Sequence, residues 1–282
     1  MLLDPGSGLT EQVVDRFRTV RAGDGPVTVV FEAGMSASAS EWVAVQRSVA
    51  RTTATLSYDR AGYAGSAPSS DGRLLTDLAA DLEHVLVAAY VTGPIVLVGH
   101  SWGCPIIRQF VQDTQRPLAG LVLVDGTVSA VMSEKEARLT TRVFGLMAAV
   151  SPVGLHKPLM RSTLKNANSG LTAEDTALIE RDMLARSGIR TAAQEAKGLV
   201  AVRPGMADLE KQGFPAGVPV TFLMGALSDK GRVEMRTAFL DATRAEADRL
   251  GARFVVGEKS SHFVPQQEPE LVVDEILRLA VR

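Results

Sequence analysis

The chain has 282 residues, 46% of them hydrophobic, with 30 basic side chains against 32 acidic ones and a net charge of −2. That near-neutral balance excludes the basic surplus of a nucleic-acid-binding protein, and the single cysteine, Cys104, excludes an internal disulfide and a multi-cysteine zinc site. A chain of 30.0 kDa goes from roughly 43,000 Å² of accessible surface unfolded to about 12,000 Å² folded, so it needs no metal or disulfide to hold its core.

Short apolar strands alternate with longer helices along the first 125 residues. The strands are expected at 13–20, 27–31, 54–58, 95–98 and 121–124, with helices after Ser40, after Thr76 and at 102–115. Strands that are apolar throughout, rather than at every second residue, are typical of a parallel sheet that helices cover on both faces. The sequence therefore predicts an α/β fold.

This alternation stops at Asp125 and returns near residue 215. Residues 129–214 have the periodicity of helices and no convincing strand. Later elements are expected at 218–224 (strand), 234–250 (helix), 253–256 (strand) and 268–281 (helix). We therefore predict an α/β core of residues 1–128 and 215–282, with a helical cap of residues 129–214 inserted into it.

The N-terminus lacks the basic stretch and apolar run of a targeting signal, because Met1-Leu2-Leu3 is followed directly by Asp4-Pro5-Gly6. The longest apolar runs, such as 143–150, fall far short of the roughly 18 residues that span a bilayer. We expect a cytoplasmic protein with a small-molecule substrate and no membrane or nucleic-acid partner. Whether it forms a homodimer is left open by the sequence.

The most informative segment is Gly99-His100-Ser101-Trp102-Gly103, which follows an apolar strand and precedes a helix. Gly-x-Ser-x-Gly alone is a weak signal, but between a strand and a helix it is typical of a sharp turn that exposes a nucleophilic serine. The glycines let the strand and the helix approach closely, and the helix N-terminus offers backbone N–H groups to an oxyanion. We therefore predict Ser101 as the nucleophile.

A serine hydroxyl needs a base to take its proton, and the chain has four histidines, at 84, 100, 156 and 262. His262 lies between the last expected strand and the last helix, so its loop should reach the same sheet edge as Ser101. We predict His262 as the base. His100 is expected to pack under the turn and His84 to be an ordinary helix residue, whereas His156 lies in the predicted cap as a candidate for lining the pocket.

Four segments together resemble the α/β-hydrolase superfamily over essentially the whole chain. Besides the serine turn, residues 58–66 are similar to its D-x-x-G-x-G-x-S segment and residues 261–270 to its catalytic-histidine loop. The loop Glu32-Ala33-Gly34-Met35 matches the place of its His-Gly, with Ala33 in place of the histidine, and Cys104 stands where a second glycine often follows the turn. The resemblance implies a mostly parallel, doubly wound sheet with a helical lid inserted after the sixth core strand.

Two aspartates end neighbouring strands at the edge where the acid of a catalytic triad must lie. Asp125 directly follows the strand at 121–124, a place that a subset of the superfamily uses. Asp229 follows the strand at 218–224, where the superfamily most often keeps its acid, although it stands one residue later than the common spacing. The acid holds the imidazole tautomer and stabilises the imidazolium. We predict Asp125 and keep Asp229 as the alternative.

An oxyanion hole needs two backbone N–H donors. Trp102, after the nucleophile, supplies one, and we expect Met35 in the early loop to supply the other. Gly34 and His156 are predicted to bind the substrate. Arg60 is expected to form a structural turn or ion pair rather than to bind the substrate.

The apolar side chains of residues 133–213 predict a largely hydrophobic pocket beneath the cap. We predict a serine hydrolase that cleaves a carboxylic ester or lactone of a small to medium, largely hydrophobic substrate through an acyl-enzyme on Ser101, without cofactor or metal. Alternatives are a C–C bond hydrolase, a cofactor-free haloperoxidase or perhydrolase, and a receptor-like protein that binds a small apolar ligand. Epoxide hydrolases and haloalkane dehalogenases are disfavoured, because those relatives carry aspartate in place of Ser101.

Overall fold

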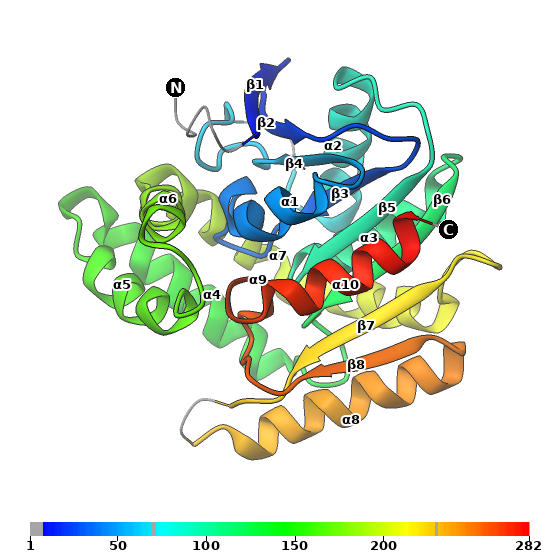
Figure 1. The fold of residues 1–282 in the computed structure, drawn as a ribbon. Coiled ribbons are helices and arrows are strands. Elements are labelled where there is room, and N and C mark those ends of the chain that lie inside the picture. The colour runs from blue at the N-terminus through cyan, green and yellow to red at the C-terminus, as the bar shows by residue number, and fades with distance from the viewer. Residues whose placement is uncertain (1–7, 69–71, 229–230, 282) are drawn as a thin grey trace.

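The computed structural model describes residues 8–68, 72–228 and 231–281, and its centre is a sheet of eight strands (Figure 1). The strand order is β1-β2-β4-β3-β5-β6-β7-β8, in which β2 pairs antiparallel with β1 and β4 and all other neighbours are parallel. The mostly parallel sheet confirms the predicted fold class. The strands are β1 Thr10–Val14, β2 Phe17–Ala22, β3 Thr28–Glu32, β4 Ala54–Tyr58, β5 Ile95–His100, β6 Leu118–Val124, β7 Val220–Gly225 and β8 Arg253–Gly257.

The N-terminal edge of the sheet differs from the single strand predicted at residues 13–20. The chain forms a hairpin there, in which Val14 of β1 lies opposite Phe17 of β2. Asp15 takes the left-handed backbone conformation, with φ 52°, that a two-residue hairpin turn requires. Apolar residues on both sides of this short turn made two strands look continuous in the sequence.

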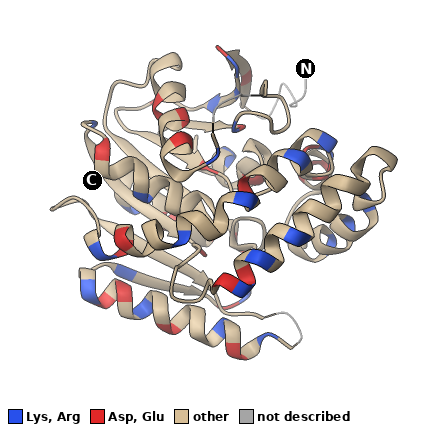
Figure 2. Ribbon diagram, turned by 180° about the vertical axis from the view of Figure 1, so that it is seen from behind, with Lys and Arg blue, Asp and Glu red and all other residues tan. Residues whose placement is uncertain are grey.

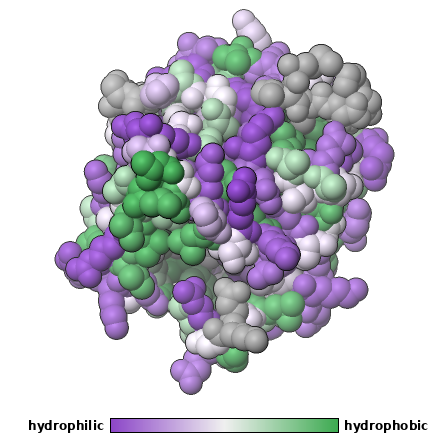
Figure 3. Space-filling view, turned by 90° about the vertical axis from the view of Figure 1, so that its left-hand side faces the viewer, coloured by the Kyte–Doolittle hydropathy of each residue, from purple (hydrophilic) through white to green (hydrophobic). Residues whose placement is uncertain are grey.

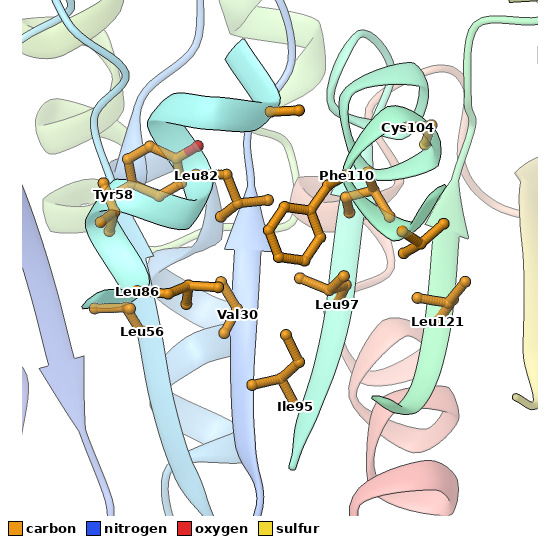
Figure 4. Close-up of a cluster of buried hydrophobic side chains, with 14 of the residues drawn as sticks. Val30, Leu56, Tyr58, Leu82, Leu86, Ile95, Leu97, Cys104, Phe110 and Leu121 are labelled. Atoms are coloured by element: carbon orange, nitrogen blue, oxygen red, sulfur yellow. The ribbon is translucent and has the colours of Figure 1, made fainter. Parts of the chain in front are cut away.

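Helices cover both faces of the sheet, and alternate strand residues point to opposite faces. In β5, Val96 and Val98 pack in the cluster with α1 and α10, whereas Ile95 and Leu97 pack in the cluster with α2 and α3. Figure 4 shows the second cluster, with Leu97 beside Phe110 of α3. The helices of the first face are η2 Ala39–Trp42, α1 Val43–Val49, α9 Val264–Gln267 and α10 Pro269–Ala280; those of the second are α2 Leu75–Ala88, α3 Gly103–Asp113 and α8 Val233–Leu250.

Between β6 and β7 the chain, which is described throughout this stretch, forms only helices, and we call these the inserted helices. Ser133 begins them with a capping box, because its hydroxyl accepts the N–H of Glu136 at 3.2 Å and its own N–H donates to the Glu136 carboxylate at 2.6 Å. The division of the chain into a core and a cap unit stays a prediction. The inserted helices are α4 Glu134–Val150, η3 Ser151–Val153, α5 His156–Ala167, α6 Ala173–Met183 and α7 Arg186–Gln212.

The inserted helices also carry many of the exposed large hydrophobic side chains, and Figure 3 shows hydrophobic side chains gathered on this side of the molecule. No single helix in the described chain is long and apolar enough to cross a membrane. The helical segment of α4 and η3 passes this test of length and composition only when it is joined to α5, and the two segments are bent by 117° relative to each other. The described residues also contain no group of three or more His, Cys, Asp or Glu side chains that could hold a metal ion.

Candidate active site

Ser101 lies in a strained turn between β5 and α3. Its φ is 52°, in the left-handed region that costs a non-glycine residue about 1–3 kcal/mol. Its N–H donates to the Val124 carbonyl oxygen at 3.0 Å, and its own carbonyl oxygen accepts the N–H groups of Cys104 and Thr127, both at 3.2 Å. These three hydrogen bonds hold the serine in its strained conformation at the start of α3.

The two glycines of the turn allow the surrounding backbone to approach closely, as the sequence predicted. A Cβ atom on Gly103 would lie 2.4 Å from the Glu32 carbonyl oxygen of β3. One on Gly99 would lie 2.8 Å from the Ile107 side chain of α3. Neither position accepts a larger residue without displacing its neighbours, so the spacing of the motif follows from packing.

Asp125 and His262 form a carboxylate–imidazole pair at the same edge of the sheet. Asp125 follows β6 with φ 45°, and its Oδ2 lies 2.6 Å from His262 Nδ1. Its Oδ1 accepts the N–H of Gly225 at 3.0 Å, and Arg236 of α8 donates to both carboxylate oxygens, with 2.9 Å between Nη1 and Oδ2. Donors from β7, α8 and the loop after β8 therefore fix one buried carboxylate.

These contacts also set the charge of Asp125. Burial by itself would raise the pKa of the carboxyl group, but the hydrogen bonds and charges of His262 and Arg236 outweigh burial and lower this pKa to about 2. An ionised carboxylate can only accept, so Nδ1 of His262 carries a proton, and Nε2 is the ring nitrogen that faces away from Asp125. The His262 side chain is 45% exposed, which leaves the ring accessible from solvent.

Of the two aspartates that the sequence offered as the acid, the structure brings Asp125 to the imidazole, while Asp229 lies outside the described residues. Arg236, which anchors Asp125, was not foreseen. It is one of several charged residues of both signs along α8 (Figure 2). Only the fold distinguishes it, by placing it against the end of β6.

The loop after β3 lies against the serine turn. A Cβ atom on Gly34 would lie 3.4 Å from Ser101 Cβ. The N–H of Gly34 is already used, because it donates to Glu41 Oε2 at 3.0 Å. Gly34 thus reaches the predicted place beside the nucleophile, but its N–H is committed to the protein itself.

The next backbone N–H groups of this loop differ in whether they already donate a hydrogen bond. The N–H of Ser36 donates to the Tyr63 hydroxyl at 3.3 Å. Met35 lies between Gly34 and Ser36, whose N–H groups both donate within the protein. In the described chain, neither the N–H of Met35 nor the N–H of Trp102, which follows Ser101, donates a hydrogen bond. The predicted oxyanion donors therefore keep free N–H groups. The side chains of Met35 and Trp102 pack in one hydrophobic cluster with residues of α2, α3, α4 and α7.

A buried arginine holds the same loop from within the protein. Arg60 donates to the carbonyl oxygens of Ala33 at 2.6 Å and Gly34 at 3.0 Å. Its Nε and Nη2 each lie 3.0 Å from a carboxylate oxygen of Glu195 in α7, and the Tyr63 hydroxyl donates to the same carboxylate at 2.8 Å. The ion pair expected at Arg60 is present with two carboxylates: Glu195 from the inserted helices and Glu32 of β3, which lies 2.8 Å from Nη1.

Comparison with known proteins places this arrangement in a family. Residues 29–275 match the model of the alpha/beta hydrolase family. The chain belongs to this family. An alpha/beta hydrolase superfamily protein of Gibberella zeae is similar over 280 residues at 26% identity, which covers 90% of this chain and 86% of the relative.

Solved structures share the fold of this alpha/beta hydrolase along nearly its whole length. An esterase from Thermogutta terrifontis has a TM-score of 0.71 at 21% identity and covers 96% of this chain and 97% of its own. A putative lipase from Acinetobacter baumannii gives 0.73 at 19%, covering 98% and 92%. An epoxide hydrolase from Vigna radiata gives 0.76 at 16%, covering 98% of both chains. At these identities the likeness shows the fold alone.

One residue predicted to bind substrate is buried among the inserted helices of this alpha/beta hydrolase. His156 of α5 is buried, and its Nε2 lies 3.2 Å from the Leu184 carbonyl oxygen. Among the described residues, no hydrogen bond or ring contact connects it with Ser101 or His262. Its Nε2 is thus directed to the backbone of the inserted helices, and a role of His156 in substrate binding stays a prediction.

Proposed function

We propose that this alpha/beta hydrolase is a serine hydrolase that cleaves a carboxylic ester or lactone through an acyl-enzyme on Ser101. The observation that carries the proposal is the 2.6 Å contact between Asp125 and His262 at the strand edge where Ser101 occupies its strained turn. A carboxylate on Nδ1 leaves Nε2 free to act as a base, which is the arrangement that activates a serine hydroxyl.

In the proposed acylation, Nε2 of His262 takes the proton of Ser101 as the serine oxygen bonds to the substrate carbonyl carbon. The carbonyl oxygen becomes an oxyanion, to which the free N–H groups of Met35 and Trp102 donate. The imidazolium, stabilised by Asp125, then protonates the leaving alkoxide as the carbon–oxygen bond breaks. The acyl group stays on Ser101; from a lactone, the released hydroxyl remains part of the same molecule.

Deacylation repeats these steps with water. Nε2 of His262 takes a proton from water, whose oxygen bonds to the acyl carbon, and the same two amides receive the second oxyanion. The imidazolium returns the proton to the Ser101 oxygen as its bond to carbon breaks, and the carboxylic acid leaves. The 45% exposure of His262 supports this step, because water must reach the ring.

The surroundings support a small to medium, largely hydrophobic substrate. Met35 and Trp102 share their cluster with partly buried side chains of the inserted helices and the segment before them, among them Met132, Phe144 and Val200. Apolar walls with a few convergent polar groups are typical of small-molecule sites. Two proteins with the same fold are named an esterase and a putative lipase, which supports an ester as the bond that is cleaved.

The serine favours a carbonyl substrate over an epoxide, although epoxide hydrolases share the fold. Attack of Ser101 on an epoxide carbon would produce a serine ether. Water at a histidine base does not cleave an ether, so the enzyme would be trapped after one turnover. An acyl ester on the same oxygen has a carbonyl carbon that water can attack, and its hydrolysis regenerates the enzyme.

Labelling with a fluorophosphonate and location of the adduct by mass spectrometry tests the proposal. We expect modification of Ser101 and its loss in Ser101→Ala, with ester turnover reduced roughly 10⁶-fold. Ser36→Ala is the matched control, because this serine lies in the neighbouring loop and its buried hydroxyl has no hydrogen-bond partner in the described chain. Equal labelling of wild type and Ser101→Ala, or no labelling of the folded wild type, would contradict the proposal.

A series of activated esters with increasing acyl length, followed by lactones of increasing ring size, then defines the substrate class. Activity that peaks at medium acyl lengths is the expected result, because the cluster around Met35 and Trp102 is apolar. A preference for charged acyl groups would contradict a hydrophobic acyl site.

A further inference from the structure

We propose that the buried pair of Glu41 and His100 is a positioning element that ties the oxyanion loop to the loop of His262, a role that rests on the function proposed above. Glu41 Oε2 accepts the N–H of Gly34 at 3.0 Å, and its Oε1 lies 2.8 Å from His100 Nδ1. On the other side of the ring, His100 Nε2 lies 2.8 Å from the His262 carbonyl oxygen. A continuous chain of hydrogen bonds thus passes beside Ser101, from one loop to the other.

The partners of this chain fix its protons. The His262 carbonyl oxygen can only accept, so His100 Nε2 carries a proton. Burial alone would raise the pKa of Glu41, but the charge of His100 and the donated hydrogen bonds lower it overall. Burial alone would lower the pKa of His100, yet Glu41 and the His262 carbonyl raise it. The pair is therefore a carboxylate and an imidazolium that donates from both nitrogens.

The surroundings leave the pair no freedom to rearrange. Both side chains are 3% exposed, so water cannot replace a lost hydrogen bond. Trp42 meets the His100 ring edge-on, with 6.4 Å between centroids, and the His262 ring lies 4.8 Å away at a tilt of 40°. A Cβ atom on Gly34 would come within 3.3 Å of His100 Nδ1. A movement of the pair must therefore move the loops that contact it.

The pair of Glu41 and His100 determines which backbone N–H group of the loop is left to face the oxyanion. Because Glu41 occupies the N–H of Gly34, the next N–H, that of Met35, is the one left free. A shift of Gly34 carries the Met35 amide with it. A misplacement of about 1 Å in an active site costs on the order of 100-fold in rate, so the pair acts on catalysis although neither side chain touches the substrate.

Glutamine substitutions test this direction of hydrogen bonding. In His100→Gln, the new side-chain amide lies between two acceptors, the Glu41 carboxylate and the His262 carbonyl, and its NH₂ group can face only one of them. In the double variant with Glu41→Gln, every link has a donor again. The Gly34 N–H donates to the amide oxygen at position 41, the NH₂ group there donates to the amide oxygen at position 100, and the NH₂ group at position 100 donates to the His262 carbonyl. The second substitution should therefore rescue the first.

We expect His100→Gln to lower kcat for an activated ester about 100-fold with KM changed less than about threefold, and the double variant to regain about tenfold of the loss. Glu246→Gln is the matched control, because Glu246 forms a comparably buried pair with Arg108, 3.0 Å apart and away from the serine turn. That variant should lose thermal stability but keep kcat. Losses that simply add in the double variant would overturn the proposal, as would an unchanged kcat in His100→Gln.

Hydrogen exchange separates this inference from the proposed activity. Measured by mass spectrometry, exchange in the peptides around residues 32–36 and 260–264 should rise in His100→Gln, fall back in the double variant and stay at the wild-type rate in Glu246→Gln. This readout needs no substrate, so it tests the positioning role even if Ser101 proves unreactive. Unchanged exchange in both peptides of His100→Gln would overturn the inference by itself.

Discussion

One side of Ser101 is open to water and the other is closed. The His262 side chain is 45% exposed, whereas Glu41 and His100, on the oxyanion side, are each 3% exposed. A base that exchanges protons with water must stay accessible to it, while amides that receive a developing negative charge act best when they are fixed before the reaction begins. In the proposed mechanism, these different degrees of burial on the two sides of one serine serve both needs.

The two sides also differ in what holds them. The open side is anchored by Arg236, which reaches Asp125 from α8 of the α/β core. The closed side is anchored by Arg60, one of whose two carboxylate partners, Glu195, comes from α7 of the inserted helices, while the other, Glu32, belongs to β3. The proposed base, His262, thus depends on the sheet and its covering helices, whereas the proposed oxyanion loop depends in addition on the insertion.

The largest expected effect is on the open side, in Asp125→Asn. We expect kcat to fall about 10³- to 10⁴-fold with a small change in KM, because the neutral amide no longer fixes the His262 tautomer or stabilises the imidazolium. Steady-state kinetics with an activated ester measures it, and Asp241→Asn on the exposed surface of α8 is the control. Undiminished activity in Asp125→Asn would transfer the role of the acid to Asp229.

Acid titration tests how much the same carboxylate, that of Asp125, contributes to the stability of the fold. The pKa of Asp125 is about 2 in the folded protein against an ordinary 3.8. A folded-state pKa below the unfolded value stabilises the fold above the unfolded pKa, so this contribution is complete above about pH 4 and is lost as the pH falls toward 2. The difference corresponds to about 2 kcal/mol of unfolding free energy.

Urea unfolding of wild type and Asp125→Asn at a series of pH values tests this contribution. The free energy of unfolding should fall less steeply between about pH 4 and about pH 2 in the variant, because its side chain does not titrate. Parallel curves for the two proteins would show that Asp125 contributes no acid-sensitive stability.

A smaller effect is expected on the closed side, in Tyr63→Phe. The Ser36 N–H loses its acceptor and Glu195 loses one of its donors, so the oxyanion loop is held less firmly. A hydrogen bond of about 1 kcal/mol corresponds to a roughly fivefold lower kcat, with KM nearly unchanged. Tyr90→Phe, at a residue 86% exposed, is the matched control. A larger change in KM than in kcat would mean that Tyr63 serves substrate binding instead.

Local patterns were enough to predict part of the candidate site. Ser101 stands in a short motif between a strand and a helix, and His262 stands in the loop before the last helix, so chain order alone assigns both to one sheet edge. The choice between Asp125 and Asp229 could not be made in this way, because both follow neighbouring strands. The contact of Asp125 with His262 spans 137 residues and exists only in the fold.

The buried partners on the oxyanion side carried no usable sequence signal. Glu41 resembles any other acidic residue near a helix start, and Glu195 lies 135 residues from the arginine that it binds. The hairpin of β1 and β2 was missed for a related reason, since the sequence around Asp15 contains neither Gly nor Pro to mark a turn. Long-range pairing and backbone conformation decide these features, and local composition does not report them.

The ion pair of Arg60 with Glu195 has a consequence for protein engineering. Exchanging the inserted helices for those of a relative is an obvious way to alter specificity, but the exchange would leave Arg60, 1% exposed, without its carboxylate on that side. Arg60 would keep Glu32, 2.8 Å from its Nη1, but its buried Nε would lose its only acceptor in the described chain. A buried donor left without an acceptor destabilises the fold, and this side chain also holds the carbonyl groups of Ala33 and Gly34. A successful graft must therefore bring an acidic side chain to the place of Glu195, so the insertion is not a freely exchangeable module.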